Sequence, residues 1–415
     1  MADVSPKDAG NDPQELDRTL EKLFESIDML PKAVRAKAQE EIRVLQAMLR
    51  ERRGPRLMLY GRRGTGKSQL TNAIFSAPVQ QTGDVHATTG KALWRSCTFG
   101  GRKVELLDTR GVQEGSAPVE ADPAESAEES LLIAVRDKSP DVIALLVKAT
   151  DVDVAIAADL DILERVHREA VRVHGTEIKI VPVLTQCDQL HPSDIKFPPH
   201  DEEDAEKQAN VEEAASVLWG HLQRHAYLSR HLAGDVVPTA ALVFFDSRGN
   251  LIKKRDYRWN IDTLALRMQE VLPDDTQIEF ARLAQFRKVQ KRLASRIVTA
   301  VSVVCGSVGA TPIPLADLPF LAVLQTTMVT LIAYISGREM SLATSKELIV
   351  ALGGNIGAGF ALREVVRGLL KVLPGAGNVA SGVVAAAGTK SLGQAAIFYF
   401  IDKRPLDAVR HFEAG

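Results

Sequence analysis

The sequence lacks the residue patterns that mark several classes of protein. Its three cysteines, Cys97, Cys187 and Cys305, lie far apart and show neither a CxxC pair nor the spacing of metal ligands. We therefore expect buried thiols in a reducing, cytosolic compartment. The formal net charge is only −2 although 25% of the residues are charged. This excludes the overall positive charge of proteins that wrap nucleic acid, so we expect no specific nucleic-acid partner.

A secretory signal and a clean hydrophobic span are also lacking. The first residues, MADVSPKDAGNDPQELD, are acidic and polar, so we expect no signal peptide and a disordered stretch over residues 1–12. Between residues 297 and 335, Pro312, Pro314, Asp317 and Pro319 interrupt the apolar residues. No uninterrupted run remains of the ~20 apolar residues that a membrane-spanning helix needs.

Three patterns divide the 415 residues. Within residues 1–54, apolar residues recur at helical spacing on both sides of Pro31, which predicts a disordered tail and a helical hairpin. Residues 55–275 alternate short apolar runs with helical patterns, which predicts an α/β, doubly wound domain with a mostly parallel, six-stranded sheet. Residues 276–415 show no strand alternation and predict an all-α domain of helical hairpins. The strands are predicted at residues 57–60, 93–99, 104–107, 142–147, 178–184 and 236–245, and the acidic segment 114–130 is predicted to be a loop.

The sequence GRRGTGKS at residues 61–68 is a complete GxxxxGKS motif between a predicted strand and a predicted helix. Its glycines allow consecutive backbone N–H groups to curl around phosphates at the start of the helix. Lys67 would reach the β- and γ-phosphates, and the Ser68 hydroxyl would bind Mg²⁺. A chance glycine-rich turn would not explain the flanking strand and helix. The predicted phosphate-binding residues are Gly61, Arg62, Arg63, Gly64, Thr65, Gly66, Lys67, Ser68 and Gln69.

A second motif, DTRG at residues 108–111, ends the strand predicted at residues 104–107. Asp108 would hold Mg²⁺ through water, and the Gly111 N–H would sense the γ-phosphate. Alone, this pattern is more often a turn, but ligands of open α/β sheets bind at the carboxyl ends of strands. In the polar loop before the strand at residues 93–99, Thr88 and Thr89 stand where a switch threonine would complete the Mg²⁺ shell, and we favour Thr89. The predicted metal ligands are Ser68, Thr89 and Asp108, and the predicted catalytic residues are Lys67, Thr89, Gly111 and Arg63.

The third motif, TQCD at residues 185–188, predicts which base is bound. The Asp188 carboxylate can accept hydrogen bonds from the ring N–H and exocyclic amine of guanine, and adenine offers no such pair of donors. Thr185 would brace the phosphate-loop side of the pocket, and the stem of Gln186 would lie over the base. An ordinary Asp turn after a strand remains the alternative. Thr239 and Ala240 would touch the guanine carbonyl through their backbone.

With these motifs in this order, residues 55–273 resemble the Era-like branch of the translation-factor-class GTPases. The resemblance implies that the chain binds GTP or GDP with Mg²⁺ and hydrolyses GTP slowly, as a nucleotide switch that controls the C-terminal domain. The segments ATPIPLADLPFL and LPGAGNVASG resemble an uncharacterised helical domain that follows such GTPases in bacteria and is linked with membranes.

Three departures from the family pattern concern hydrolysis. Val112 stands where Ras-type enzymes have the glutamine that orients the attacking water, which predicts slow turnover and acceleration by an activating protein or by self-association. Gly64 replaces the asparagine of potassium-dependent Era-like enzymes, which argues against potassium activation. Arg62 and Arg63 resemble the P-loop arginine with which guanylate-binding large GTPases neutralise charge on dimerisation. A solvated arginine pair is the alternative.

Other interpretations remain open. The chain would otherwise be a GTP-binding, membrane-associated scaffold or remodelling module with negligible turnover, or an ATPase. The C-terminal domain is either a soluble core of helical hairpins or a peripheral or re-entrant membrane element. In the second case, a basic helix over residues 282–296 would contact the anionic inner face of the cell membrane.

Overall fold

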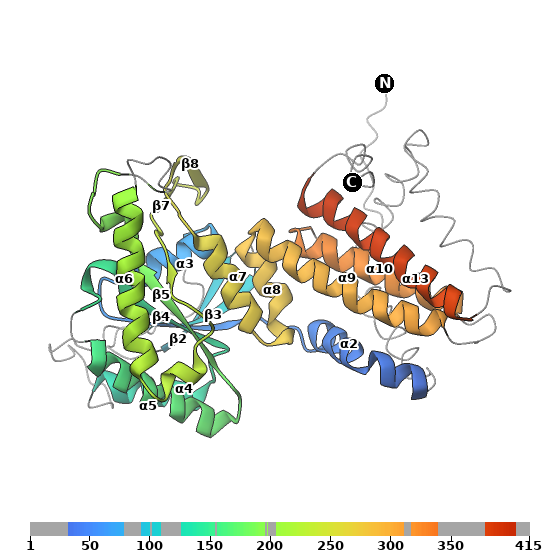
Figure 1. Cartoon of the computed structure of the whole chain (residues 1–415), viewed down its shortest axis with the longest axis horizontal. Coiled ribbons are helices and arrows are strands. Elements are labelled where there is room, and N and C mark those ends of the chain that lie inside the picture. The colour runs from blue at the N-terminus through green and yellow to red at the C-terminus, as the bar shows by residue number, and fades with distance from the viewer. Residues whose placement is uncertain are drawn as a thin grey trace. The chain divides into compact units, whose positions relative to one another are not determined.

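The computed structural model describes residues 32–78, 93–99, 102–108, 126–153, 156–195, 197, 205–310, 317–338 and 378–403 (Figure 1). The chain divides into two compact units. Residues 53–286 form the first, which we call the sheet unit. The second combines residues 1–52 with residues 287–415, and we call it the helical unit.

The sheet unit contains a six-stranded sheet whose order is β2-β3-β1-β4-β5-β6. All neighbouring strands are parallel except β2 and β3, which are antiparallel. The central strands are almost wholly buried and apolar, as is typical of parallel sheets covered on both faces. The predicted doubly wound, mostly parallel sheet is confirmed. The strands are β1 (Arg56–Tyr60), β2 (Leu93–Phe99), β3 (Arg102–Asp108), β4 (Val142–Lys148), β5 (Lys179–Thr185) and β6 (Val237–Pro238).

Helices surround this sheet (Figure 1). The apolar faces of α4, α5 and α6 share one buried cluster with strand residues such as Met58, Ile143 and Ile180. Helix α3 contacts α7 and α8, where the rings of Phe75 and Phe280 meet edge to face at 6.3 Å. The helices are α3 (Lys67–Phe75), α4 (Ala127–Asp137), α5 (Ile156–His174), α6 (Ala205–Arg224), α7 (Ile261–Val271) and α8 (Asp274–Ala284).

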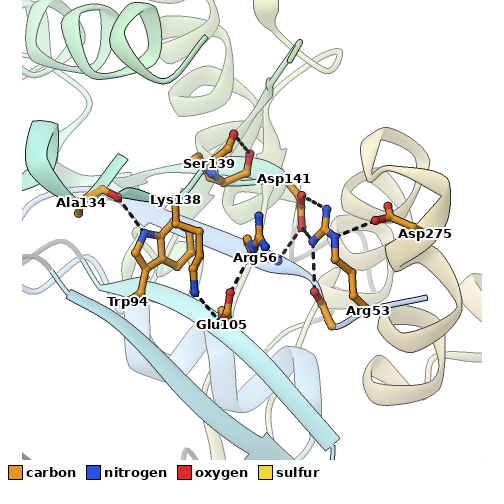
Figure 2. Close-up of polar contacts among 11 residues, drawn as sticks. Arg53, Arg56, Trp94, Glu105, Ala134, Lys138, Ser139, Asp141 and Asp275 are labelled. Carbon is orange, nitrogen blue, oxygen red and sulfur yellow. Dashed lines mark hydrogen bonds and ion pairs between the residues drawn. The ribbon is translucent and has the colours of Figure 1, made fainter. Parts of the chain in front are cut away.

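A polar cluster anchors the sheet unit where the chain leads into β1 (Figure 2). The Arg53 guanidinium donates two hydrogen bonds to Asp141, at 2.8 and 2.7 Å, and forms an ion pair of 2.7 Å with Asp275. The Arg56 N–H also donates to Asp141, at 2.8 Å. Desolvation raises the pKa of Asp275 even though Arg53 lies beside it. The start of β1 is thereby joined to β4 and to the first turn of α8.

Two predictions within the sheet unit were wrong. The apolar run at residues 236–245 is not one strand, because β6 ends at Pro238 and β7 (Val243–Phe245) pairs instead with β8 (Leu251–Asp256) in a separate antiparallel hairpin. The predicted loop 114–130 ends earlier than expected. The Ser126 hydroxyl accepts a hydrogen bond from the Glu129 N–H and caps α4, an arrangement that the Ser-x-x-Glu pattern encodes. Residues 111–125 lie outside the described residues.

The described part of the helical unit consists of helices only. They are α2 (Lys32–Arg50), α9 (Arg287–Gly309), α10 (Asp317–Ile335) and α13 (Asn378–Ala396), which continues into the π-helical turn Ile397–Ile401. Helix α9 packs against the other three, so α2 belongs with the C-terminal helices. The first helix of the predicted N-terminal hairpin and both predicted proline-containing turns lie outside the described residues.

Helices α9 and α13 approach each other through small residues. A Cβ atom on Gly382 would lie 2.7 Å from the Gly306 carbonyl oxygen, and one on Gly393 would lie 2.4 Å from a methyl group of Val298. Within the residues that the structure describes, α9 is the one helix long and apolar enough to cross a membrane, and 56% of its apolar window is buried by packing.

The basic stretch at residues 282–296 is not the single helix that was predicted. Gln285 adopts a left-handed conformation (φ 54°) that ends α8, and α9 begins at Arg287. Arg282 is buried in α8, whereas Arg287 is exposed. Helix α8 therefore groups with the sheet unit, which extends to Phe286.

Candidate nucleotide-binding site

The loop between β1 and α3 has the backbone shape of a phosphate cradle. Gly64 and Gly66 take left-handed φ angles of 82° and 84°, which glycine adopts without steric cost. Gly66 stands immediately before the helix, and its carbonyl accepts the Leu70 N–H at 2.8 Å. The loop thus turns at these two glycines and presents the N-terminus of α3 to the carboxyl edge of the sheet.

Two side chains brace this loop from within. The Lys67 ammonium donates to the carbonyl oxygens of Gly61 and Arg62, at 2.8 and 3.0 Å, and therefore lies across the loop. The buried Thr65 hydroxyl also donates to the Arg62 carbonyl, at 2.9 Å. Ser68 is exposed in the first turn of α3. The roles of Lys67 and Ser68 toward phosphates and magnesium stay predictions.

The phosphate loop and the TQCD motif meet although they are far apart in the sequence. Gln186 takes a left-handed φ of 57°, and its Nε2 donates to the Gly64 carbonyl oxygen at 2.5 Å. Thr185 instead donates to the Val147 carbonyl in β4, at 3.3 Å. The contact with the phosphate loop therefore comes from Gln186, whereas the prediction had assigned it to Thr185.

A pocket lies between these two motifs. Asp188, in the turn Cys187–Gln189, is half-buried and lies at its wall. The pocket is lined by Thr65, Gly66, Gln69, Leu70, Thr185, Gln186, Asp188, Gln189, Ala241 and Leu242.

The segment after β6 supports the pocket differently from the prediction. Thr239 is buried, and both its N–H and its hydroxyl donate to the Leu184 carbonyl, at 2.7 and 3.0 Å. Its own carbonyl accepts the Cys187 N–H at 3.1 Å. Ala240 is buried too and pairs with Trp259, so the two residues that follow, Ala241 and Leu242, supply the lining. Burial raises the pKa of the Cys187 thiol to about 12, which leaves it unreactive.

The two arginines of the phosphate loop differ in their surroundings. The Arg62 guanidinium forms an ion pair of 2.6 Å with Asp159 of α5, and the Tyr60 hydroxyl donates to the carbonyl of the same aspartate at 2.8 Å. Arg63 is exposed. Arg62 is thus committed to α5 in this structure, and Arg63 is the more accessible of the two.

The oxygen donors at this edge fit magnesium, which prefers hydroxyl, carboxylate and phosphate oxygens. Asp108 is the last residue of β3 and pairs in register with Leu59, two residues before the phosphate loop. Thr89, Gly111 and Val112 lie outside the described residues. Among the described ones, no three His, Cys, Asp or Glu side chains gather to hold a metal. A magnesium site needs no such cluster, because one or two side chains act together with substrate phosphates.

Lys207 of α6, which the sequence motifs did not indicate, is completely buried beside the TQCD motif. Its ammonium donates to the Asp188 carbonyl at 2.8 Å. In the sequence it stands in a charged helical stretch, AEKQANVEE, and resembles an ordinary solvated lysine. No local pattern distinguishes it, because its partners are backbone carbonyls.

Two family models match the chain. Residues 56–184 match the family described as 50S ribosome-binding GTPase, and residues 275–410 match a domain of unknown function, DUF697. The uncharacterized protein YkfA of Escherichia coli is 30% identical over 139 residues, which are 34% of this chain and 44% of that protein. The tRNA modification GTPase MnmE of Paracoccus denitrificans is 34% identical over 97 residues, 23% of each chain. The chain thus spans less than half the length of these curated relatives.

Among solved structures, Toc33 from Arabidopsis thaliana in complex with Mg²⁺ and GMPPNP is similar. It is 15% identical, with a TM-score of 0.32, and the match covers 59% of this chain and 94% of that one.

Proposed function

We propose that this chain, in which a P-loop GTPase domain is joined to a DUF697 domain, binds GTP with Mg²⁺, hydrolyses it slowly and uses the nucleotide state to control its helical unit. The match of residues 56–184 to a GTPase family and the cradle built by Gly64, Gly66 and Lys67 support the first part. Control of the helical unit rests on the covalent joining of the two domains in one chain.

The observation that carries this proposal is the hydrogen bond from Gln186 to the Gly64 carbonyl. It joins the loop that would bind phosphates to the loop that would read the base, and both face one pocket. Asp188 at the wall of that pocket favours guanine, because its carboxylate can accept two hydrogen bonds that adenine cannot donate.

Each residue has a defined role in the proposal. Lys67 binds the β- and γ-phosphates, while Ser68 and Asp108 hold Mg²⁺, which when bound neutralises charge on the phosphate oxygens. Thr89 would complete the metal shell, and the Gly111 N–H would contact the γ-phosphate. The backbone of the loop and the N-terminus of α3 bind the phosphates through N–H groups.

Calorimetry of the full chain with GTP and Mg²⁺ tests the binding step. We expect GTP to bind and to be displaced by GDP but not by ATP, because Asp188 has no partners on adenine. The Asp188→Ala variant should bind GTP more weakly and lose its preference for guanine, so that GTP and ATP bind with similar affinity through their triphosphates. Displacement by ATP as effective as by GTP would show that the pocket does not select guanine and would contradict the role of Asp188.

Slow hydrolysis, accelerated by self-association or by an activating protein, follows from Val112 and from the two arginines. Because Arg63 is exposed, whereas Arg62 is half-buried against Asp159, Arg63 is the better candidate to neutralise charge on the phosphates of its own or a second chain. We expect kcat to rise with protein concentration in the native chain and in Arg62→Ala, and to stay low in Arg63→Ala. A turnover that is independent of concentration in all three would remove this role.

A GTP-binding scaffold at the inner face of the cell membrane is the second candidate. It is favoured by Val383 and Val384 on α13, which are 65% and 49% exposed, and by exposed basic residues such as Arg287 and Lys288 near the start of α9. Two assays separate the scaffold from the hydrolysing switch: flotation with anionic liposomes at low salt, and single-turnover release of phosphate. Flotation without phosphate release supports the scaffold, and release without flotation supports a cytoplasmic switch.

A further inference from the structure

Helix α6 holds the loop that follows Asp188 by an unusual set of contacts. The Lys207 side chain is fully buried, and its ammonium donates to three carbonyl oxygens of this loop. The distances are 2.8 Å to Asp188, 2.6 Å to Leu190 and 2.9 Å to Pro192. One turn further along α6, the Asn210 amide donates to the His191 carbonyl at 2.8 Å. Two side chains of one helix therefore bind four of the five carbonyls between residues 188 and 192.

This arrangement uses every donor that Lys207 has. An ammonium group offers three N–H donors, and each has a carbonyl acceptor here. Among the described residues, the ammonium forms no ion pair with a carboxylate, and the ring of Phe197 lies 5.4 Å away. Desolvation accordingly lowers the pKa of Lys207. A buried charge satisfied only by backbone carbonyls is costly, and a methionine would fill the same space without that cost.

The contacts bear directly on the residue that would read the base. Asp188 is fixed from one side by the Cys187 N–H, which donates to Thr239 after β6, and from the other by Lys207. Asp188 lines the pocket, and its carboxylate takes its position from a backbone clamped at both ends. Base recognition through two parallel hydrogen bonds requires such fixed geometry, because a small displacement breaks one or both.

We propose that Lys207 is a positioning residue for guanine specificity, acting with Asn210 to fix the loop at residues 188–192 so that the Asp188 carboxylate meets both donors of the base. This inference rests on the proposed binding of guanine nucleotides. It assigns to α6, a helix outside the nucleotide motifs, control over which base is accepted.

The test compares GTP with inosine triphosphate, which lacks the exocyclic amine of guanine. We expect the native full-length chain to bind GTP roughly ten to a hundred times more tightly, the effect of one hydrogen bond to a carboxylate. In Lys207→Met, GTP affinity should fall about tenfold or more, and the ratio of the two dissociation constants should approach one. In an Asp188→Ala background, Lys207→Met should change GTP affinity less than about threefold, because the residue it positions is gone.

A matched control separates positioning from general stability. The Arg267 guanidinium donates to the Ala233 carbonyl at 2.6 Å, at the opposite end of β5 and β6. Arg267→Met also removes a side chain that binds a backbone carbonyl, so it should lower the melting temperature and leave the ratio for the two nucleotides unchanged. Should Lys207→Met fail to fold, Asn210→Ala replaces it. That side chain is only half-buried, and its loss should lower the ratio about two- to fivefold.

The outcomes distinguish the inference from the proposed function. Failure of the native chain to bind GTP overturns both. The role of α6 is overturned, and guanine binding left intact, if the native chain prefers GTP and the folded Lys207→Met variant has the same ratio of dissociation constants for the two nucleotides. If Lys207→Met does not fold, an unchanged ratio in Asn210→Ala has the same meaning. The role of α6 is also overturned if Arg267→Met lowers the ratio of the two dissociation constants as much as Lys207→Met does, since a general loss of stability would then explain the effect.

Discussion

Replacing His167 with glutamine should remove a pH dependence that burial builds into the sheet unit. His167 is completely buried on α5. Its Nε2 contacts the Ile178 carbonyl at 2.8 Å and its Nδ1 contacts the Tyr227 hydroxyl at 2.9 Å. Because a carbonyl can only accept, Nε2 carries the proton and donates, and Nδ1 of the neutral ring accepts from Tyr227. Both ring nitrogens are thus satisfied without a positive charge.

Burial lowers the pKa of His167 to about 4, from an ordinary value near 6.5. The unfolded chain therefore takes up a proton as the pH falls below 6.5, whereas the folded chain does so only near pH 4. Stability is fully present above pH 6.5 and is lost as the pH falls between these values. The shift corresponds to about 3 kcal/mol, of which about 2 kcal/mol is lost by pH 5.

Urea unfolding of the full chain, followed by tryptophan fluorescence, measures this effect. All three tryptophans, Trp94, Trp219 and Trp259, lie in the sheet unit, so their emission reports on that unit. A glutamine amide can donate to Ile178 and accept from Tyr227, so His167→Gln keeps both kinds of bond but does not titrate.

We expect the free energy of unfolding of the native chain, minus that of the variant, to fall by about 2 kcal/mol from pH 7.5 to pH 5. Carboxylates titrate in both proteins and cancel in this difference. Burial also lowers the pKa of the neighbouring His231, which should contribute in the same sense. Replacing both histidines with glutamine should therefore make the free energy of unfolding depend even less on pH. Parallel pH profiles for the native chain and His167→Gln would refute the reasoning.

Three further predictions concern other parts of the chain. Arg53→Met removes both hydrogen bonds to the buried Asp141. Because the arginine is about a third exposed, we expect the free energy of unfolding in urea to fall by about 2 kcal/mol. The double variant Arg53→Met/Asp141→Asn should be no less stable than Arg53→Met alone. Gly64→Ala meets no neighbour but must adopt a φ of 82°, so it should cost about 1 kcal/mol by the same assay, and Gly64→Asn should cost less because asparagine tolerates this conformation. Gly393→Ala would overlap Val298 of α9 and should lower the thermal midpoint measured by helical circular dichroism. Gly388 has open space around it, so Gly388→Ala should raise that midpoint. Equal effects of the two variants would contradict the close packing.

The phosphate loop could be predicted from the sequence because the residues that form it are adjacent in the chain. Eight consecutive residues specify the two left-handed glycines, the lysine and the hydroxyl, and the flanking strand and helix have clear periodicity. The same holds for Asp188, which stands at the end of a buried strand. The doubly wound, mostly parallel sheet could be predicted because a short apolar strand before each helix leaves few alternative topologies.

What could not be predicted depends on partners distant in the sequence. Lys207 resembles a surface lysine until its three carbonyl acceptors are known, and backbone carbonyls leave no signature in the sequence. The lining by Ala241 and Leu242 rather than by Thr239 and Ala240 depends on β6 having only two residues, which periodicity cannot detect. The break at Gln285 was missed because a left-handed residue there needs no glycine.

The contact between α9 and α13 has a consequence for the environments that the helical unit tolerates. Where Gly382 lies against the Gly306 backbone, the attraction comes from closely fitted atoms rather than from the expulsion of water. Attraction of that kind keeps its strength when the surrounding medium changes from water to hydrocarbon, whereas a seam of large aliphatic side chains loses its advantage there. The contact at Gly382 should therefore depend less on the surrounding solvent than a seam of large aliphatic side chains would.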